Sequence, residues 1–172
     1  FFYQYCTEKK KSQSKSLVLD KDMLLLCEQL QEDYKNQPEY IPSYAVELAI
    51  LTGMRVGEIA ALTWDCISED GILINKSEKY NRKTNAYFID ETKNKKERLF
   101  PMCDEISKLL AKVKKVELQN GYICEWVFAN EEGRVHAPVI SSCIKNKCRQ
   151  LGIEERGIHA LRKTFNSKIR NK

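Results

Sequence analysis

The sequence has no apolar run long enough to cross a membrane and no recognisable signal peptide, so we expect no membrane-spanning segment. Its seven cysteines are scattered and form no Cys-x-x-Cys pair. This argues against a disulfide framework and favours reduced thiols in a cytoplasmic protein. A zinc site using His136, Cys143 and Cys148 would lack a fourth ligand at a suitable spacing, so we expect no metal site. Internal repeats are also absent.

The 172 residues, 42% of them apolar, are enough for one domain with a substantial core. Residues 1–16 are polar and rich in Lys and Ser, and we expect them to form an exposed linker. Residues 17–172 would then form a single domain.

Apolar spacing separates helical from extended stretches. Helical periodicity, with Gly or Pro at the ends, predicts helices over residues 20–36, 44–51, 106–120, 140–151 and from 159 towards 172. Three short apolar runs between turn sequences predict strands at residues 72–74, 87–89 and 98–100. The expected fold is α+β and mainly α-helical, with a small three-stranded antiparallel sheet.

Basic charge is concentrated in two segments. Residues 76–98 contain eight Lys or Arg against four Asp or Glu, and residues 134–172 contain ten against two. The whole chain carries a net charge of only +5, so the remainder is net acidic. This distribution is typical of a protein that presents one face to a polyanion.

The apolar run Tyr44–Leu51 predicts a buried helix, which Gly53 would end by adopting a positive φ. A second short helix then begins with Arg55 in its first turn. A cation is unfavourable at a helix start unless an anion binds beside it, where Arg and free backbone N–H groups would act together. The alternative is a local ion pair between Arg55 and Glu58 at i,i+3 spacing.

Two further segments carry residues suited to phosphate chemistry. On the last predicted helix, His159, Arg162 and Asn166 share a face distinct from the apolar stripe, and an outward-facing His and Arg can bind phosphate and move a proton. Lys93 lies in a basic turn before the third predicted strand. Neighbouring cations such as Arg98 can lower its pKa, so that it donates a proton. The alternatives are a surface helix with incidental charges and a turn that only adds solubility.

Along the chain, Arg55 comes first, Lys93 follows on a hairpin, and His159 and Arg162 lie on a late helix. This arrangement resembles the catalytic domain of the tyrosine recombinases, the phage-type integrase family. The resemblance rests on Thr52–Trp64, on Lys93 with Glu97–Pro101, and on His159–Phe165, and it extends from about residue 17 onwards. It implies an enzyme that cuts DNA through a 3′-phosphotyrosyl intermediate and rejoins it to another 5′-hydroxyl. No cofactor is implied, because the bond energy is kept in the covalent intermediate.

The resemblance assigns catalytic roles to four residues. Arg55 and Arg162 would hold the non-bridging phosphate oxygens and stabilise the transition state. Lys93 would protonate the leaving 5′-oxygen, and His159 would assist proton transfer or hold the phosphate. Glu58 would support Arg55.

The implied partner is double-stranded DNA, bound by a homo-oligomer that is a tetramer in the intact recombinase of a bacterial or phage-encoded mobile element. We expect the following basic residues to contact DNA: Lys79, Arg82, Lys83, Lys95, Lys96, Lys145, Lys147, Arg149 and Lys163.

The sequence departs from the family pattern in one respect. None of its eight tyrosines lies beyond Arg162, where the family places its nucleophile. We therefore expect a chain truncated at both ends, which binds DNA but does not cleave it. The alternative is a DNA-binding module that kept the fold and lost the chemistry. A generic basic adaptor would leave Arg55, His159 and Arg162 unexplained.

Overall fold

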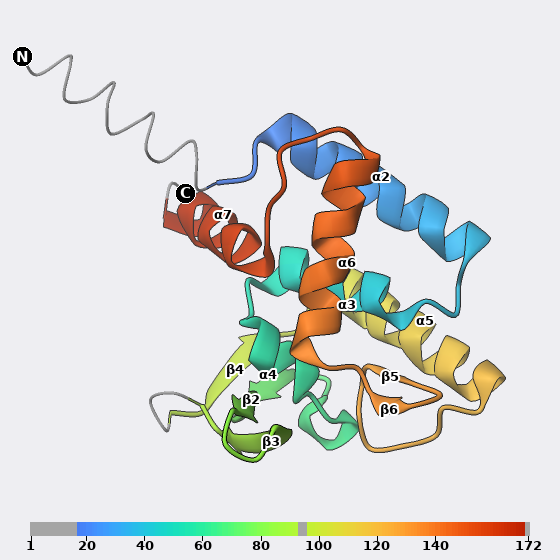
Figure 1. Cartoon of the computed structure of the whole chain (residues 1–172), viewed down its shortest axis with the longest axis vertical. Coiled ribbons are helices and arrows are strands. Elements are labelled where there is room, and N and C mark those ends of the chain that lie inside the picture. Colours follow the sequence, from blue (N-terminus) through green and yellow to red (C-terminus); the bar gives the residue numbers. More distant parts are fainter. Residues whose placement is uncertain (1–16, 93–95, 171–172) are drawn as a thin grey trace, which may run out of the picture.

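The computed structural model describes residues 17–92 and 96–170, so the predicted linker lies outside the described residues. The elements in chain order are α2 (Asp20–Asn36), α3 (Ile41–Thr52), α4 (Val56–Ala60), η1 (Trp64–Cys66), β1 (Gly71–Ile74), β2 (Lys76–Asn81), β3 (Ala86–Glu91), β4 (Arg98–Pro101), α5 (Asp104–Asn120), β5 (Ala129–Asn130), β6 (Gly133–Arg134), α6 (Ala137–Gln150) and α7 (Ile158–Arg170). Figure 1 shows the long helices gathered around α3, with β2, β3 and β4 at the lower left. The predicted class, mainly helical with small antiparallel sheets, is confirmed.

Helix α3 forms the centre of the core. Nine of its twelve residues are buried, and it packs against α2, α5, α6 and α7. A helix that is apolar on all sides is stable only when it is surrounded in this way. Pro42 lies in its first turn, where no backbone N–H is needed. Gly53 ends it in the left-handed conformation at φ 62°, as the sequence predicted.

The surrounding helices follow the predicted ranges closely, and α2, α5 and α6 bury the apolar side that their periodicity indicates. On α7 the predicted apolar stripe is buried only in part, because Leu161 is buried whereas Ile169 is 57% exposed. Asp20 opens α2 as its first helical residue, and Leu19 precedes it as an N-cap without a side-chain hydrogen bond. The Asp20 carboxylate instead lies 2.9 Å from Lys168 of α7. The backbone N–H of Val18 donates to the Thr164 hydroxyl at 2.9 Å, so α7 is bound to the first described residues.

The predicted three-stranded sheet is wrong in detail. The described strands form three two-stranded sheets, in which β1 pairs with β4, β2 with β3 and β5 with β6. The strand over residues 76–81 was missed because its sequence, KSEKYN, is almost wholly polar and lacks the alternation of a half-buried strand. The β2–β3 hairpin is therefore an insertion in the sequence between β1 and β4, which pair with each other.

A buried carboxylate joins this hairpin to α6. Glu78, 7% exposed, accepts hydrogen bonds from Arg134 Nε and from the backbone N–H of Ala137, both at 2.9 Å. His136 Nδ1 lies 2.7 Å from the same carboxylate, and the His136 ring stacks on Tyr87 of β3. These contacts hold the first turn of α6 and the hairpin in fixed relation, because a buried carboxyl group is stable only with such hydrogen-bond partners.

Candidate active site

The turn between α3 and α4 positions Arg55. The Thr52 hydroxyl donates to the Leu48 carbonyl at 2.6 Å and accepts from the backbone N–H of Met54 at 3.2 Å. Met54 is buried beneath the turn, so the backbone is fixed on both sides of Gly53. Arg55 follows as the N-cap of α4, with 45% of its side chain exposed.

Glu58 holds both the backbone and the side chain of Arg55. One carboxylate oxygen accepts from the Arg55 backbone N–H at 2.9 Å, and the other accepts from Arg55 Nη1 at 3.0 Å. The ion pair that the sequence suggested as an alternative is therefore present. It uses only Nη1 of the guanidinium group, and 45% of the Arg55 side chain remains exposed.

Arg98 of β4 makes a second, two-pronged contact with the same carboxylate. Its Nη1 and Nη2 donate to the two oxygens of Glu58 at 2.9 and 2.6 Å. Burial would raise the pKa of the Glu58 carboxyl, but the hydrogen bonds from Arg98 and Arg55 outweigh this and hold the pKa below its usual value. Glu58 is therefore ionised, with a side chain only 1% exposed.

Helix α7 brings the second sequence motif to this turn. Arg162 Nη1 donates to the Gly53 carbonyl at 2.5 Å, across 109 residues of sequence. The Phe165 ring lies directly over Gly53, so close that a Cβ at this position would be 2.6 Å from a ring carbon. Burial, followed by the positive charges of Arg55 and Arg98, lowers the pKa of Arg162 below its usual value. We call Arg55, Arg98 and Arg162, which surround Glu58, the arginine cluster.

Of the other two predicted catalytic residues, the structure describes His159 but not Lys93. His159 is exposed on α7, one turn before Arg162. Lys93 lies outside the described residues. Lys95 does too, whereas Lys96 is described and exposed.

Among the described residues, the predicted DNA-binding side chains fall on the surface, with one exception. Arg82, Lys83 and Lys163 are exposed, and Lys79 is half exposed beside Asp90. Lys145 and Arg149 are half exposed and both lie near Glu155.

Lys147, which the sequence predicted to contact DNA, is instead buried. Its side chain is 6% exposed and forms an ion pair with Asp33 of α2. Its charge therefore joins α6 to α2 inside the protein instead of facing a ligand. Sequence spacing alone did not reveal this, because Lys147 lies between two surface cations, Lys145 and Arg149.

Arg98 is the residue of the arginine cluster that the sequence does not predict. The sequence indicates it only as a cation that could influence Lys93, whereas the structure places it against Glu58. The sequence contains only a weak indication of this position. Arg98 is a cation at the start of a strand that pairs with a core strand, where it lies opposite Ile74.

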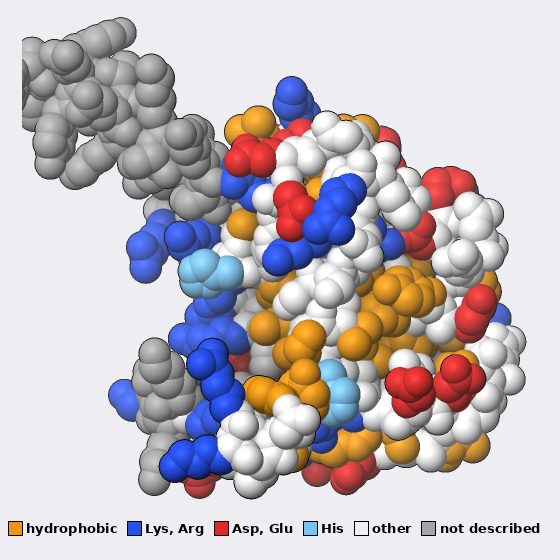
Figure 2. Space-filling view, in the orientation of Figure 1, with side chains coloured by type: hydrophobic (Ala, Val, Ile, Leu, Met, Phe, Trp, Pro, Cys, Tyr) orange, Lys and Arg blue, Asp and Glu red, His pale blue; other side chains and the backbone are white. Residues whose placement is uncertain are grey.

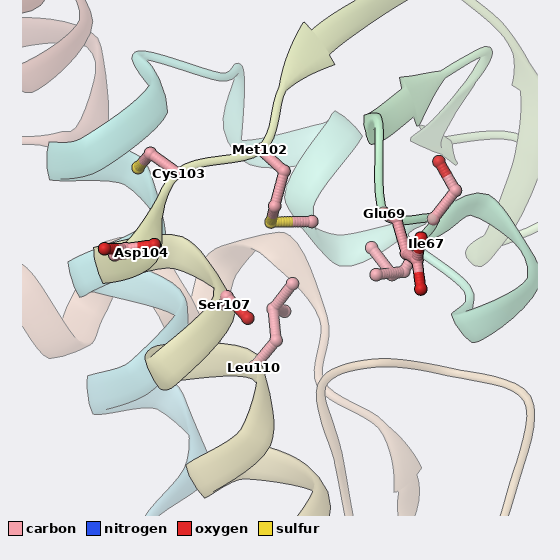
Figure 3. Close-up of a pocket in the computed structure, with 8 residues that line it drawn as sticks. Ile67, Glu69, Met102, Cys103, Asp104, Ser107 and Leu110 are labelled. Carbon is pink, nitrogen blue, oxygen red and sulfur yellow. The ribbon is translucent and has the colours of Figure 1, made fainter.

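Figure 2 shows Lys and Arg side chains along the left side of the molecule, around a hollow between α7 and the strands. A different cavity, of about 470 Å³, lies between the β1 turn and the start of α5 (Figure 3). Its lining contains Glu69 and Asp104 but no Lys or Arg, so it is unsuited to an anion. Within the described ranges no helix could span a membrane, and no His, Cys, Asp or Glu cluster is suited to a metal ion.

Three solved structures share this fold. The integrase of transposon Tn1549, solved with transposon right-end DNA, is 19% identical with a TM-score of 0.75, over 90% of this chain and 53% of that chain. XerA recombinase is 20% identical with a TM-score of 0.62, over 90% of this chain and 51% of the other. Lambda integrase, solved as a tetramer on a Holliday junction, is 16% identical with a TM-score of 0.57, over 86% and 40%. The chain thus spans about half the length of the first two.

No curated protein matches the sequence. The model of the phage integrase family, however, matches residues 21–172, which include the α3–α4 turn, β4 and α7. This match confirms the resemblance that the motifs indicated. The chain belongs to the phage integrase family.

Proposed function

We propose that this chain supplies the phosphate-binding part of the active site of a site-specific DNA recombinase encoded by a mobile element. One observation carries the proposal: Arg162 of α7 is hydrogen-bonded to the turn that presents Arg55. Arg55, whose side chain is 45% exposed, and Arg162, which is partly exposed, are held by separate, well-packed elements, and their guanidinium groups can together grip the non-bridging oxygens of one phosphodiester. A surface helix with incidental charges would not need this long-range contact.

In the proposed reaction, a tyrosine oxygen attacks the phosphorus and the bond to the 5′-oxygen breaks. Lys93 gives a proton to that oxygen, which leaves as a 5′-hydroxyl, and the DNA remains joined to the tyrosine through its 3′-phosphate. A 5′-hydroxyl from another strand then attacks, and the tyrosine is released. Arg55 and Arg162 stabilise the extra negative charge in both steps, and His159 assists the proton transfers.

The nucleophile in this proposal is not one of the tyrosines in the described part of the chain. Tyr44 is buried and Tyr34 is partly buried, and the hydroxyl groups of Tyr34 and Tyr44 donate to Glu47 and to the Pro38 carbonyl, respectively. Tyr87 is stacked on His136 in the hairpin. We propose that the tyrosine comes from a segment outside residues 1–172, so that this polypeptide by itself binds DNA without cutting it.

The proposed partners are double-stranded DNA and further copies of the same protein, as a tetramer in the intact recombinase. The DNA would lie along the basic side of Figure 2, against the β2–β3 hairpin, α7 and the exposed cations of α6. Residues 17–172 would form the catalytic domain and residues 1–16 the linker to a DNA-binding domain. The proposed location is the cytoplasm.

The test uses the whole reading frame that contains residues 1–172 and nicked duplexes from the ends of its element. Covalent protein–DNA adducts are counted on denaturing gels. We expect adducts, and a loss of roughly a hundredfold or more in rate for Arg55→Ala and Arg162→Ala. Lys93→Ala should recover on a substrate whose bridging 5′-oxygen is sulfur, because that leaving group needs no proton. Salt-dependent binding without any adduct would instead identify a DNA-binding module that has lost the chemistry.

A further inference from the structure

Glu58 creates an electrostatic problem for the site. It is an ionised, buried carboxylate that contacts Arg55 directly, and an Arg55–Glu58 pair alone carries no net charge. A phosphate approaching such a pair would be attracted by the guanidinium group and repelled by the carboxylate a few ångströms behind it. The residue that positions Arg55 would therefore also weaken it as an anion-binding group.

Arg98 removes this problem. Its two-pronged contact places a second positive charge on the same carboxylate, so that Arg55, Glu58 and Arg98 together carry a net charge of +1. We propose that Arg98 is a positioning residue of the phosphate site, which cancels the charge of Glu58 and thereby leaves the charge of Arg55 available to the DNA phosphate. This inference rests on the proposed function, because it specifies how the same site binds its anion.

The surroundings of Arg98 support an electrostatic role. Its side chain is 38% exposed, and it lies on β4, whose backbone is already held by pairing with β1. Burial, and after it the positive charges of Arg55 and Arg98, lower the pKa of Arg162, so the three guanidinium groups lie close enough to interact. An anion between Arg55 and Arg162 would lie in the field of all three.

Substitutions can separate charge from structure. Arg98→Gln reduces the net charge of Arg55, Glu58 and residue 98 from +1 to zero. Arg98→Lys keeps the charge but loses the planar fork. The double variant Glu58→Gln/Arg98→Gln restores +1 without an ion pair, and its amide oxygen can still accept a hydrogen bond from Arg55.

The experiment titrates residues 1–172 with inorganic phosphate at low salt and follows the arginine Nε–H signals by NMR. We expect Arg98→Gln to weaken phosphate binding by about tenfold, the scale for one unit charge several ångströms away in a partly exposed site. Arg98→Lys and the double variant should both bind phosphate about as tightly as the parent. Lys115→Gln, an equal charge change on the exposed side of α5, is the matched control and should have little effect.

The outcomes distinguish the two proposals. If Arg55→Gln abolishes phosphate binding but Arg98→Gln does not weaken it, the role of Arg98 is refuted and the proposed site stands. If the double variant binds as poorly as Arg98→Gln, charge compensation is refuted. If the parent chain binds phosphate no better than Arg55→Gln does, the proposed function itself loses its basis. Should Arg98→Gln fail to fold, Glu58→Gln replaces it: charge compensation predicts that Glu58→Gln, with a local net charge of +2, binds phosphate about tenfold more tightly than the double variant, and equal affinities refute it.

Discussion

Two buried glutamates show how the partners of a carboxylate decide its protonation. Glu58 accepts hydrogen bonds from two guanidinium groups, which hold its pKa below the usual value. Glu117 of α5 accepts one hydrogen bond, from the backbone N–H of Ala129 at 3.0 Å, and is only 2% exposed. Burial raises its pKa to about 7, because the Ala129 N–H and the charge of Lys114 only partly oppose it.

This raised pKa predicts a pH dependence of stability with a definite sign. Between about pH 4.5 and 7 the folded protein keeps a proton on Glu117 that the unfolded chain has released, so the free energy of unfolding falls as pH rises through this window. The loss should be roughly 2 kcal/mol after allowance for solvent screening. Urea unfolding at pH 5 and pH 8 measures it. Glu117→Gln should remove this part of the dependence, while the exposed Glu131→Gln should not.

At the scale of elements, the contact between α7 and the α3–α4 turn decides whether the arginine cluster forms. Gly53 has two reasons to be glycine: its φ of 62° and the Phe165 ring above it. Gly121, which ends α5 at φ 76°, has only the first reason, because no atom lies within 4 Å of a Cβ built there.

The two glycines form a matched pair for a stability test. Gly121→Ala should cost about 1 kcal/mol in the free energy of unfolding, from backbone strain alone. Gly53→Ala should cost a further 1–3 kcal/mol or so, because the added methyl group must displace Phe165. Urea unfolding gives both values, and equal losses would contradict the close packing of α7 on the turn.

The Asp33–Lys147 pair gives a second prediction at this scale. Lys147→Met should destabilise the protein by about 3 kcal/mol, since it leaves a carboxylate without its partner between α2 and α6. The same change should leave DNA affinity unaltered. Lys145→Gln, two residues away and exposed, should do the opposite: nearly full stability with weaker DNA binding. If Lys147→Met loses DNA affinity at a temperature where it is folded, Lys147 contacts DNA after all.

These elements also show what the sequence could predict. Helices with long apolar periodicity and a glycine at their end were predicted to within three residues at each end, because burial and backbone strain leave clear local patterns. Strand β2 was missed because a solvated hairpin strand needs no apolar alternation. Burial of Lys147 and the recruitment of Arg98 depend on which segments meet in space, and neither leaves a local signal. The roles of Lys93 and His159 stay predictions.

At the scale of the whole molecule, the uneven charge becomes one basic side (Figure 2). Binding to duplex DNA should therefore weaken steeply with salt, with log K falling by about 0.9 for each phosphate contacted. Replacing Lys79, Arg82 and Lys83 of the hairpin by Gln should reduce this slope by up to about 3 units. The same substitutions at Lys108, Lys112 and Lys115 of α5 serve as control, with an equal change in net charge, and should alter the slope far less. A salt-independent affinity would rule out the basic side as a DNA interface.

The hydrogen bonds of α7 also impose an order on events during translation. This helix reaches back across 146 residues to Val18 and across 109 residues to Gly53. While the chain is being synthesised, the basic hairpin of residues 76–91 leaves the ribosome well before α7 does, and contacts this distant in sequence are late to form. The nascent protein therefore acquires the positive charge of the hairpin first, and only the last described helix completes the arginine cluster that we propose holds a phosphate.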